Sequence, residues 1–177
     1  MIQYNNISEI IPCKNTVLTI GSFDGMHLGH QSIFGKIKKL SEQYNYKNVV
    51  ISFYPHPQLI INKVSFSGHI DSRIEKIEKI RNLDIDILLL IRFSKAIMTI
   101  KAIDFLRNII VEKFQPKIIV LGYNHSFGFQ KEGDFNFLKK YKNQYGYELI
   151  KIDEYIFDEE NCSSSHIREN LKQGNID

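Results

Sequence analysis

The chain has 177 residues, of which 43% are apolar and 24% charged, and its net charge is +3 with the histidines counted as neutral. This composition is typical of a globular domain and excludes a fibrous or intrinsically disordered protein. The small net charge does not predict binding to nucleic acid, although it suits a substrate that carries several phosphates.

The sequence predicts a cytoplasmic protein that does not bind membranes. The N-terminal segment MIQYNNISEIIPCKN lacks the basic start and apolar core of a signal peptide. No uninterrupted apolar run reaches the length of about 18 residues that a membrane-spanning helix needs. Cys13 and Cys162 are far apart and match no disulfide or zinc spacing, so both are expected to be reduced thiols.

Short, nearly continuous apolar runs predict five strands, at residues 16–20, 48–53, 86–91, 117–121 and 147–152. Such runs are typical of parallel strands that are covered on both faces. The longest region without a pattern, residues 54–69, is long for a connection in a compact domain. We expect it to be a functional loop or a lid.

Apolar residues at helical spacing fill the gaps between these runs. Three such stripes, each expected to face the core, are Ile33, Ile37, Leu40 and Tyr44; Ile70, Ile74, Ile77 and Ile80; and Ala102, Phe105, Leu106, Ile109 and Ile110. Ser72 and Glu75 form a capping box, Thr99 precedes the third stripe, and Gly174 follows the last helix.

The alternation of strands and helices predicts an α/β fold. We expect residues 1–177 to form a single domain, with a Rossmann-like, open, mostly parallel five-stranded sheet and helices on both faces. In such sheets ligands bind beyond the carboxyl ends of the strands.

The segment GSFDGMHLGH, residues 21–30, falls where the first run ends and a helix is expected to begin. Its three glycines allow a sharp turn and a close approach of the backbone to a ligand. The free amides at a helix start favour an anion. His27 and His30, three residues apart, would lie on one face and donate hydrogen bonds to phosphate oxygens.

Two other interpretations of the histidine pair are open. It could form part of a metal site, but no third ligand stands at a recognisable metal spacing, or the histidines could be satisfied structural residues. The dinucleotide pattern G-x-G-x-x-G and the P-loop lysine are both absent. The glycines and their position between strand and helix favour a phosphate site.

Four segments in order resemble the bacterial FAD synthetases, the FMN adenylyltransferase module of the bifunctional riboflavin kinase/FAD synthetases in the HxGH nucleotidylyltransferase superfamily. They are GSFDGMHLGH (21–30), SFYPHPQ (52–58), GYNHSFGFQKEGD (122–134) and SSSHIRENLKQGNID (163–177). The resemblance implies the nucleotidylyltransferase fold. It also implies transfer of AMP from ATP to the phosphate of FMN, which gives FAD and pyrophosphate with Mg²⁺ supplied with the ATP.

The resemblance also implies site residues, among which no metal ligand is expected. The catalytic residues would be His27, His30, Asn124 and Arg168. Binding of ATP would involve Gly21, Ser22, Phe23, Asp24, Gly25, His27, Gly29, His30, Ser163, Ser164, Ser165 and Arg168. Binding of FMN would involve Phe53, Pro55, His56, Pro57 and Asn124.

Each of these roles has a structural alternative. Asp24 would support the turn through backbone amides rather than bind a metal. The serines could be a helix N-cap beside a surface arginine at position 168. Asn124 could be a buried amide that bonds only the chain, and the Pro-His-Pro segment could be no more than a rigid loop.

The sequence departs from the pattern of the family at several places. Ser165 stands where members commonly have threonine, Ser126 where they often have a basic residue, and Ser22 where they often have asparagine. Members usually continue into a riboflavin kinase domain, which we do not expect within residues 1–177. The chain is then either a natural single-function enzyme or a shortened one, and a separate riboflavin kinase domain or protein would be its partner.

Two rival functions remain. A cytidylyltransferase that activates a phosphorylated alcohol would share the G-x-F-D-x-x-H-x-G-H turn, but the usual R-T-x-G-I-S-T-T signature is absent. A flavin- or nucleotide-binding module without catalysis is the other, and His27, His30, Asn124 and Arg168 argue against it.

Overall fold

The structure is a computed structural model that describes residues 1–62, 66–154, 156–157, 160–161 and 163–175. Cys13 is a free thiol, as expected. Cys162 lies outside the described residues. No described helix is both long and apolar enough to span a membrane.

The described part of the chain is built on a six-stranded sheet in which every neighbouring pair is parallel, in the order β1-β4-β3-β2-β5-β6. The strands are β1 (Ile2–Tyr4), β2 (Thr16–Ile20), β3 (Lys47–Tyr54), β4 (Ile87–Arg92), β5 (Pro116–Gly122) and β6 (Glu148–Ile152). The predicted α/β fold class is confirmed. The predicted number of five strands is wrong by one, because the three residues of β1 are too few to show a strand pattern.

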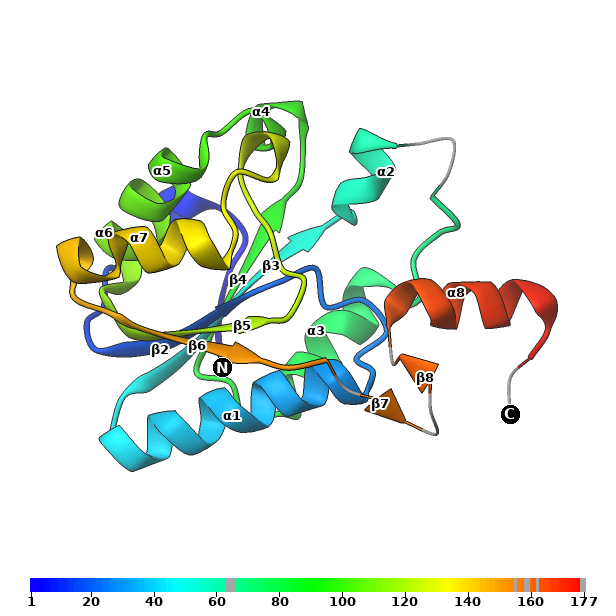
Figure 1. The fold of residues 1–177 in the computed structure, drawn as a ribbon, viewed down its shortest axis with the longest axis horizontal. Helices are drawn as coiled ribbons and strands as arrows, with labels where there is room; N and C mark the ends of the chain where they lie inside the picture. Colours follow the sequence, from blue (N-terminus) through cyan, green and yellow to red (C-terminus); the bar gives the residue numbers. More distant parts are fainter. Residues whose placement is uncertain (63–65, 155, 158–159, 162, 176–177) are drawn as a thin grey trace.

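Helices cover both faces of this sheet (Figure 1). One apolar core joins it to α1 (Leu28–Tyr44) and α3 (Arg73–Arg81). A second core, on the other face, joins it to α5 (Ala102–Phe105), the π-helical segment η2 (Leu106–Val111), α6 (Glu112–Phe114) and α7 (Phe135–Tyr145). Strand β2 is buried along its whole length because it lies between the two cores.

The remaining described elements lie around the carboxyl ends of the strands or link the main ones. They are the 3₁₀ turns η1 (Ile7–Glu9) and η3 (Phe129–Lys131), the short helices α2 (Pro57–Ile61) and α4 (Lys95–Met98), the antiparallel strands β7 (Ile156–Phe157) and β8 (Glu160–Asn161), and the terminal helix α8 (Ser164–Gln173). Helix α2 falls within the region that the sequence left without a pattern.

Most residues of the predicted core stripes are buried, but Ile74 and Tyr44 are exposed, and Ile70 precedes α3 and is only partly buried. Ile74 is 68% exposed, because the buried face of α3 is centred on Lys76, Ile77 and Ile80. Tyr44, at the end of α1, is 47% exposed and stacks on the next tyrosine in the chain.

Two of the three predicted helix-end signals are confirmed. Ser72 and Glu75 form the reciprocal capping box of α3, and Gly174 ends α8 in the left-handed conformation. Thr99 does not begin a helix. It ends α4, a short helix capped by Ser94 that precedes the predicted stripe.

Candidate active site

The turn between β2 and α1 carries the glycine- and histidine-rich segment. Gly25 has a φ of +84°, a conformation that side chains rarely adopt, and an added Cβ would lie 2.8 Å from Ile70. The Gly25 amide donates to the Asp71 carboxylate at 2.9 Å. A side chain at Gly21 would overlap the ring of Phe23 at 2.6 Å. The turn therefore needs glycine at both positions.

Asp24 anchors this turn to the segment that precedes α3. Its carboxylate is fully buried and accepts hydrogen bonds from the amides of Ile70 and Asp71, both at 3.1 Å. It also forms an ion pair with Arg168 of α8. Asp24 supports the turn through backbone amides, as the sequence predicted, and it does not line the pocket described below.

Lys76 is a buried cation beneath the same turn, and sequence analysis missed it. Its ammonium donates to the carbonyl oxygen of Ser22 at 2.6 Å and to that of Phe53 at 3.3 Å. It thereby ties the turn to the carboxyl end of β3. Burial lowers the pKa of Lys76 to about 8, although the negative charges of Asp24 and Asp71 oppose the shift.

Replacing Lys76 with methionine should lower the free energy of unfolding by about 1–3 kcal/mol, because two buried carbonyl groups would lose their donor. Urea denaturation of the wild type and the Lys76→Met variant measures this. Lys39→Met, on an exposed position of α1, is the matched control. Equal denaturation midpoints for both variants would contradict the role given to Lys76.

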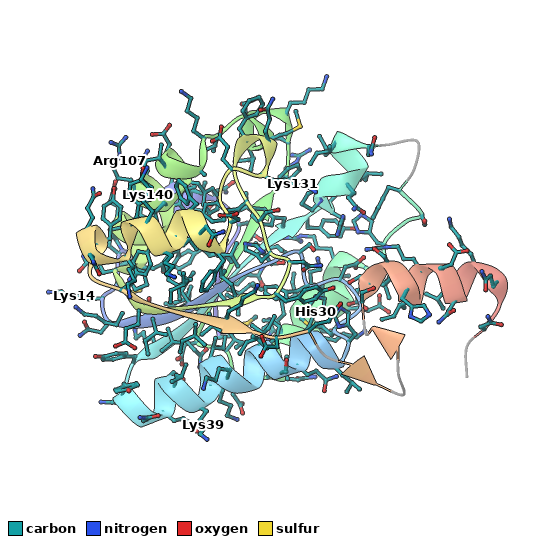
Figure 2. All side chains as sticks on the ribbon, in the orientation of Figure 1. Lys14, His30, Lys39, Arg107, Lys131 and Lys140 are labelled. Carbon is teal, nitrogen blue, oxygen red and sulfur yellow. The ribbon has the colours of Figure 1, made fainter. Side chains whose placement is uncertain are left out.

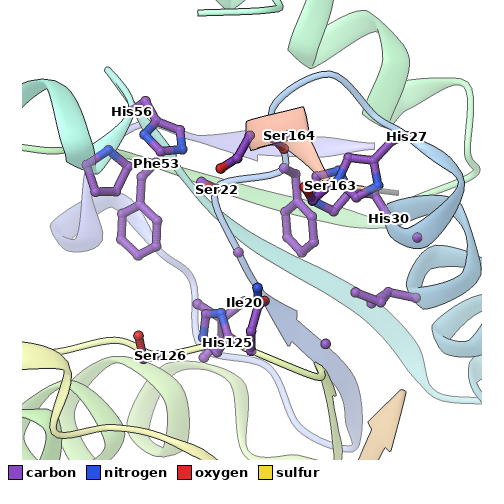
Figure 3. A pocket seen from close by; sticks show the side chains of 18 of the residues that line it. Ile20, Ser22, His27, His30, Phe53, His56, His125, Ser126, Ser163 and Ser164 are labelled. Atoms are coloured by element: carbon purple, nitrogen blue, oxygen red, sulfur yellow. The ribbon is translucent and has the colours of Figure 1, made fainter. Parts of the chain in front are cut away.

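His27 and His30 lie together, as predicted from their spacing. His27 is the N-cap of α1 and His30 lies in its first turn, with their rings stacked at 3.6 Å between centroids (Figure 3). Burial lowers the pKa of both imidazoles, that of His30 to about 3. Both rings are therefore neutral at physiological pH, and each can donate one hydrogen bond.

The start of α8 faces the same space as the start of α1. Ser163 caps α8 by accepting the amide of His166 at 3.2 Å, and the Ser164 hydroxyl donates to the carbonyl oxygen of Asp24 at 2.7 Å. The N-cap alternative is thus observed for Ser163. Its hydroxyl proton is still free to be donated, because the oxygen acts as an acceptor in the cap.

Arg168 is not a surface residue, so that alternative is wrong. The side chain is 7% exposed and its guanidinium donates to Asp24, to the carbonyl oxygen of Gly68 at 2.9 Å and to that of Ser164 at 3.2 Å. Most of its hydrogen-bonding capacity is spent within the protein. Arg168 nevertheless reaches the wall of the pocket.

The segment after β3 forms the opposite wall, where Figure 3 shows Phe53 and His56 across from the histidine pair. Nδ1 of His56 accepts the amide of Gln58 at 3.2 Å, so the neutral ring carries its proton on Nε2. Burial lowers the pKa of His56 to about 4, and the charge of Arg168 adds to this shift. Pro57 begins α2 as its first residue.

These walls enclose a pocket of about 330 Å³ at the carboxyl ends of β2, β3 and β5. The predicted site residues that line it are Gly21, Ser22, Phe23, His27, Gly29, His30, Phe53, His56, Pro57, Asn124, Ser163, Ser164, Ser165 and Arg168. Asp24, Gly25 and Pro55 do not line it. Asp24 and Gly25 point into the supporting loop instead, and Pro55 lies in a separate hollow beside Arg73.

Sequence analysis missed several other residues of the wall, namely Ile20, Ile33, Gln58, Gly122, Tyr123, His125, Ser126 and Lys131. Burial lowers the pKa of His125 to about 4. Five of these eight residues lie in the segment 122–134 around Asn124, so that segment was the available signal in the sequence. Among the described residues, no group of three or more His, Cys, Asp or Glu side chains could hold a metal ion.

The architecture and the pocket together define the class of this protein. A parallel sheet places a glycine turn, two neutral histidines and two helix starts around one cavity, which is a setting for phosphate groups. These features define an α/β protein with a candidate phosphate-binding site at the carboxyl ends of its strands.

Comparison with known proteins makes the assignment more specific. The sequence model of the FAD synthetase family matches residues 11–166. This chain belongs to the FAD synthetase family, which confirms the family predicted from its motifs.

The relatives are bifunctional proteins. The bifunctional riboflavin kinase/FMN adenylyltransferase of Buchnera aphidicola subsp. Acyrthosiphon pisum is 37% identical over 97% of this chain and 54% of that protein. The protein of the same name from Escherichia coli K12 is 26% identical over 97% of this chain and 55% of that protein. The chain thus spans about half the length of these relatives.

A solved structure has the same fold. It is named as a macrolide-efflux protein from Streptococcus pneumoniae, and it matches with a TM-score of 0.84 and 27% sequence identity. The match covers 99% of this chain and 57% of that one.

Proposed function

We propose that this chain transfers AMP from ATP to the phosphate of FMN, giving FAD and pyrophosphate. The observation that carries the proposal is the convergence of the α1 and α8 starts, with His27 and His30, on one pocket at the ends of the parallel strands. Membership of the FAD synthetase family supports the same reaction. We regard residues 1–177 as one adenylyltransferase domain.

The reaction requires alignment of two anions rather than a strong base. A phosphate monoester already carries about −1.5 to −2 charge near neutral pH, so its oxygen can attack the α-phosphorus directly. A new O–P bond forms as the bond from the α-phosphorus to the bridging oxygen breaks, and pyrophosphate leaves with the electron pair. The protein has to hold the partners in line and stabilise the departing charge.

The donors on the α1 and α8 side suit the triphosphate. His27 and His30 would donate to the α- and β-phosphates, and the N-cap side chain of His27 does not occupy the first amides of α1. Gly21, Ser22, Phe23, Gly29 and the serines 163–165 would contribute to the same ATP site. Arg168 would act mainly by holding Asp24 and the α8 start in place, with its remaining donors directed at phosphate.

The opposite wall suits the flavin. Phe53 and Pro57 contribute apolar side chains to the pocket wall beside the His56 ring, with Pro55 fixing the backbone behind them. Asn124, at the end of β5, would lie between the FMN phosphate and the α-phosphorus.

Mg²⁺ would enter bound to ATP, as part of the substrate. FMN would come from a separate riboflavin kinase domain or protein. The transfer of AMP to FMN would take place in the cytoplasm, where ATP and FMN are present. We propose no contact with nucleic acid or membrane.

Incubating the purified chain with Mg²⁺, ATP and FMN, and separating the flavins by chromatography, tests the proposal. We expect FAD and pyrophosphate in equal amounts, and no phosphorylation of riboflavin offered in place of FMN. Turnover with CTP and a phosphorylated alcohol, without FAD, would show the cytidylyltransferase instead. Tight binding of FMN and ATP without any product would show a non-catalytic module.

A further inference from the structure

The pocket contains few positive charges for a site that takes two polyanions. Among the described residues that line it, only Lys131 and Arg168 are lysine or arginine, and none is a carboxylate. Burial lowers the pKa of each lining imidazole, so these rings are neutral, namely His27, His30, His56 and His125. Arg168 is paired with Asp24.

Lys131 is therefore the cation of the pocket wall that is not already neutralised. Its ammonium makes no hydrogen bond or ion pair with any residue that the structure describes. It extends from the loop between β5 and α7 (Figure 2). An exposed lysine without a partner is common on protein surfaces, but Lys131 borders the pocket that is proposed to bind phosphate groups.

The loop that carries Lys131 is closed and anchored. Phe127 and Gly133 exchange both backbone hydrogen bonds, at 2.8 and 2.9 Å. The Phe129 amide donates to the carbonyl oxygen of Ile100 at 2.7 Å, which fixes the loop to the start of α5. The position of Lys131 is thus set by the fold.

The backbone at Lys131 is also strained. Gln130 and Lys131 have φ values of 51° and 62°, a left-handed conformation that is uncommon for residues other than glycine, asparagine and aspartate. The Lys131 amide donates to the carbonyl oxygen of Gly128 at 3.2 Å, which closes the turn. Such strain is concentrated at ligand-binding positions.

The location within the pocket indicates which phosphate Lys131 meets. The donors for the triphosphate gather at the starts of α1 and α8, whereas Ser126, in the same segment as Lys131, lies on the far side in Figure 3. We propose that Lys131 binds the phosphate monoester of the acceptor and holds it for attack on ATP. This inference rests on the proposed function.

Flavin binding separates this role from a structural one. Titrations of protein against FMN and against riboflavin, followed by flavin fluorescence, compare ligands that differ only in the phosphate. In Lys131→Met we expect FMN to bind about tenfold more weakly, as for loss of a charged hydrogen bond near solvent. Riboflavin affinity should be unchanged, Lys131→Arg should retain FMN affinity, and Lys39→Met is the control for net charge.

Added salt gives a second readout that does not depend on riboflavin. Raising the NaCl concentration should weaken FMN binding to the wild type more than to Lys131→Met, because screening acts on the charge pair. An equal salt dependence in the two proteins would overturn the proposal.

Other results would also overturn it. Equal weakening of FMN and riboflavin would make Lys131 a structural residue, and a loss of ATP affinity with unchanged FMN affinity would place it at the triphosphate. The proposed function fails separately, if the wild type binds FMN through Lys131 but forms no FAD. If the wild type forms FAD and Lys131→Met binds FMN normally, only the inference about Lys131 fails.

Discussion

Replacing His30 with alanine is expected to lower kcat for FAD formation by about 10²-fold or more, as for loss of a donor to charge that develops in the transition state. The KM for ATP should rise much less. His27→Ala should act in the same way, because the two rings are stacked at 3.6 Å and open on one pocket. Steady-state rates measured at varied ATP concentration test both variants.

The pH profile gives an independent check on His30. Burial, with smaller contributions from His27 and Lys76, lowers its pKa to about 3, so the ring is neutral throughout the neutral range. We expect no change in kcat from this group between about pH 6 and 8. His30→Gln, which keeps a donor, should recover part of the rate, and near-normal turnover in His27→Ala and His30→Ala would refute the assignment.

The sequence predicted the elements whose pattern is local. Strands β2 to β5 lie inside the sheet and show as apolar runs because both of their faces are covered, and the buried stripes of α1 and η2 repeat at helical spacing. Strand β1 has only three residues, and it becomes the edge strand through pairing with β4, where Ile2 lies opposite Ile87. That pairing depends on residues that are distant in the sequence, so the three residues of β1 carry no local pattern that predicts it.

The site also contains residues that a local sequence pattern predicts and residues that only the fold brings into place. The turn at residues 21–30 and the α8 start were predicted because glycine, serine and histidine mark them in the sequence. Lys76 sits within a helix at a position where lysine is ordinarily exposed, and only the fold brings its ammonium under Ser22. Lys131 belongs to a segment noted for Asn124, but its approach to the pocket depends on a left-handed loop.

For Arg168 the sequence predicted the correct pocket but only part of the role of the side chain. Helix-start position and positive charge predicted a phosphate contact, and the residue does line the pocket. Its partner Asp24 lies 144 residues earlier, and this separation hides the pair from any reading of local spacing. The pair joins the two helix starts, so it serves the site even where it does not touch a ligand.

The ion pair between Asp24 and Arg168 is expected to contribute strongly to the free energy of unfolding. Replacing Asp24 with asparagine would place an amide nitrogen against donors, either the Ile70 amide and Arg168 or the Asp71 amide. It would also leave the buried guanidinium without a counter-charge. Breaking a buried pair in this way costs about 3–5 kcal/mol, which corresponds to a fall in Tm on the order of 10 °C for a chain of this size.

Thermal unfolding of Asp24→Asn beside Asp84→Asn tests this expectation, because Asp84 pairs with Lys38 on the surface and is 73% exposed. Burial raises the pKa of Asp24, but hydrogen bonds from Ile70, Asp71 and Arg168 outweigh it and hold the pKa below its ordinary value. The stability from Asp24 is therefore complete above about pH 4 and is lost as the pH falls through the lowered pKa. The difference in Tm between the wild type and Asp24→Asn should therefore become smaller in acid. If Asp24→Asn has the same Tm as Asp84→Asn at pH 7, the ion pair between Asp24 and Arg168 does not hold the site together.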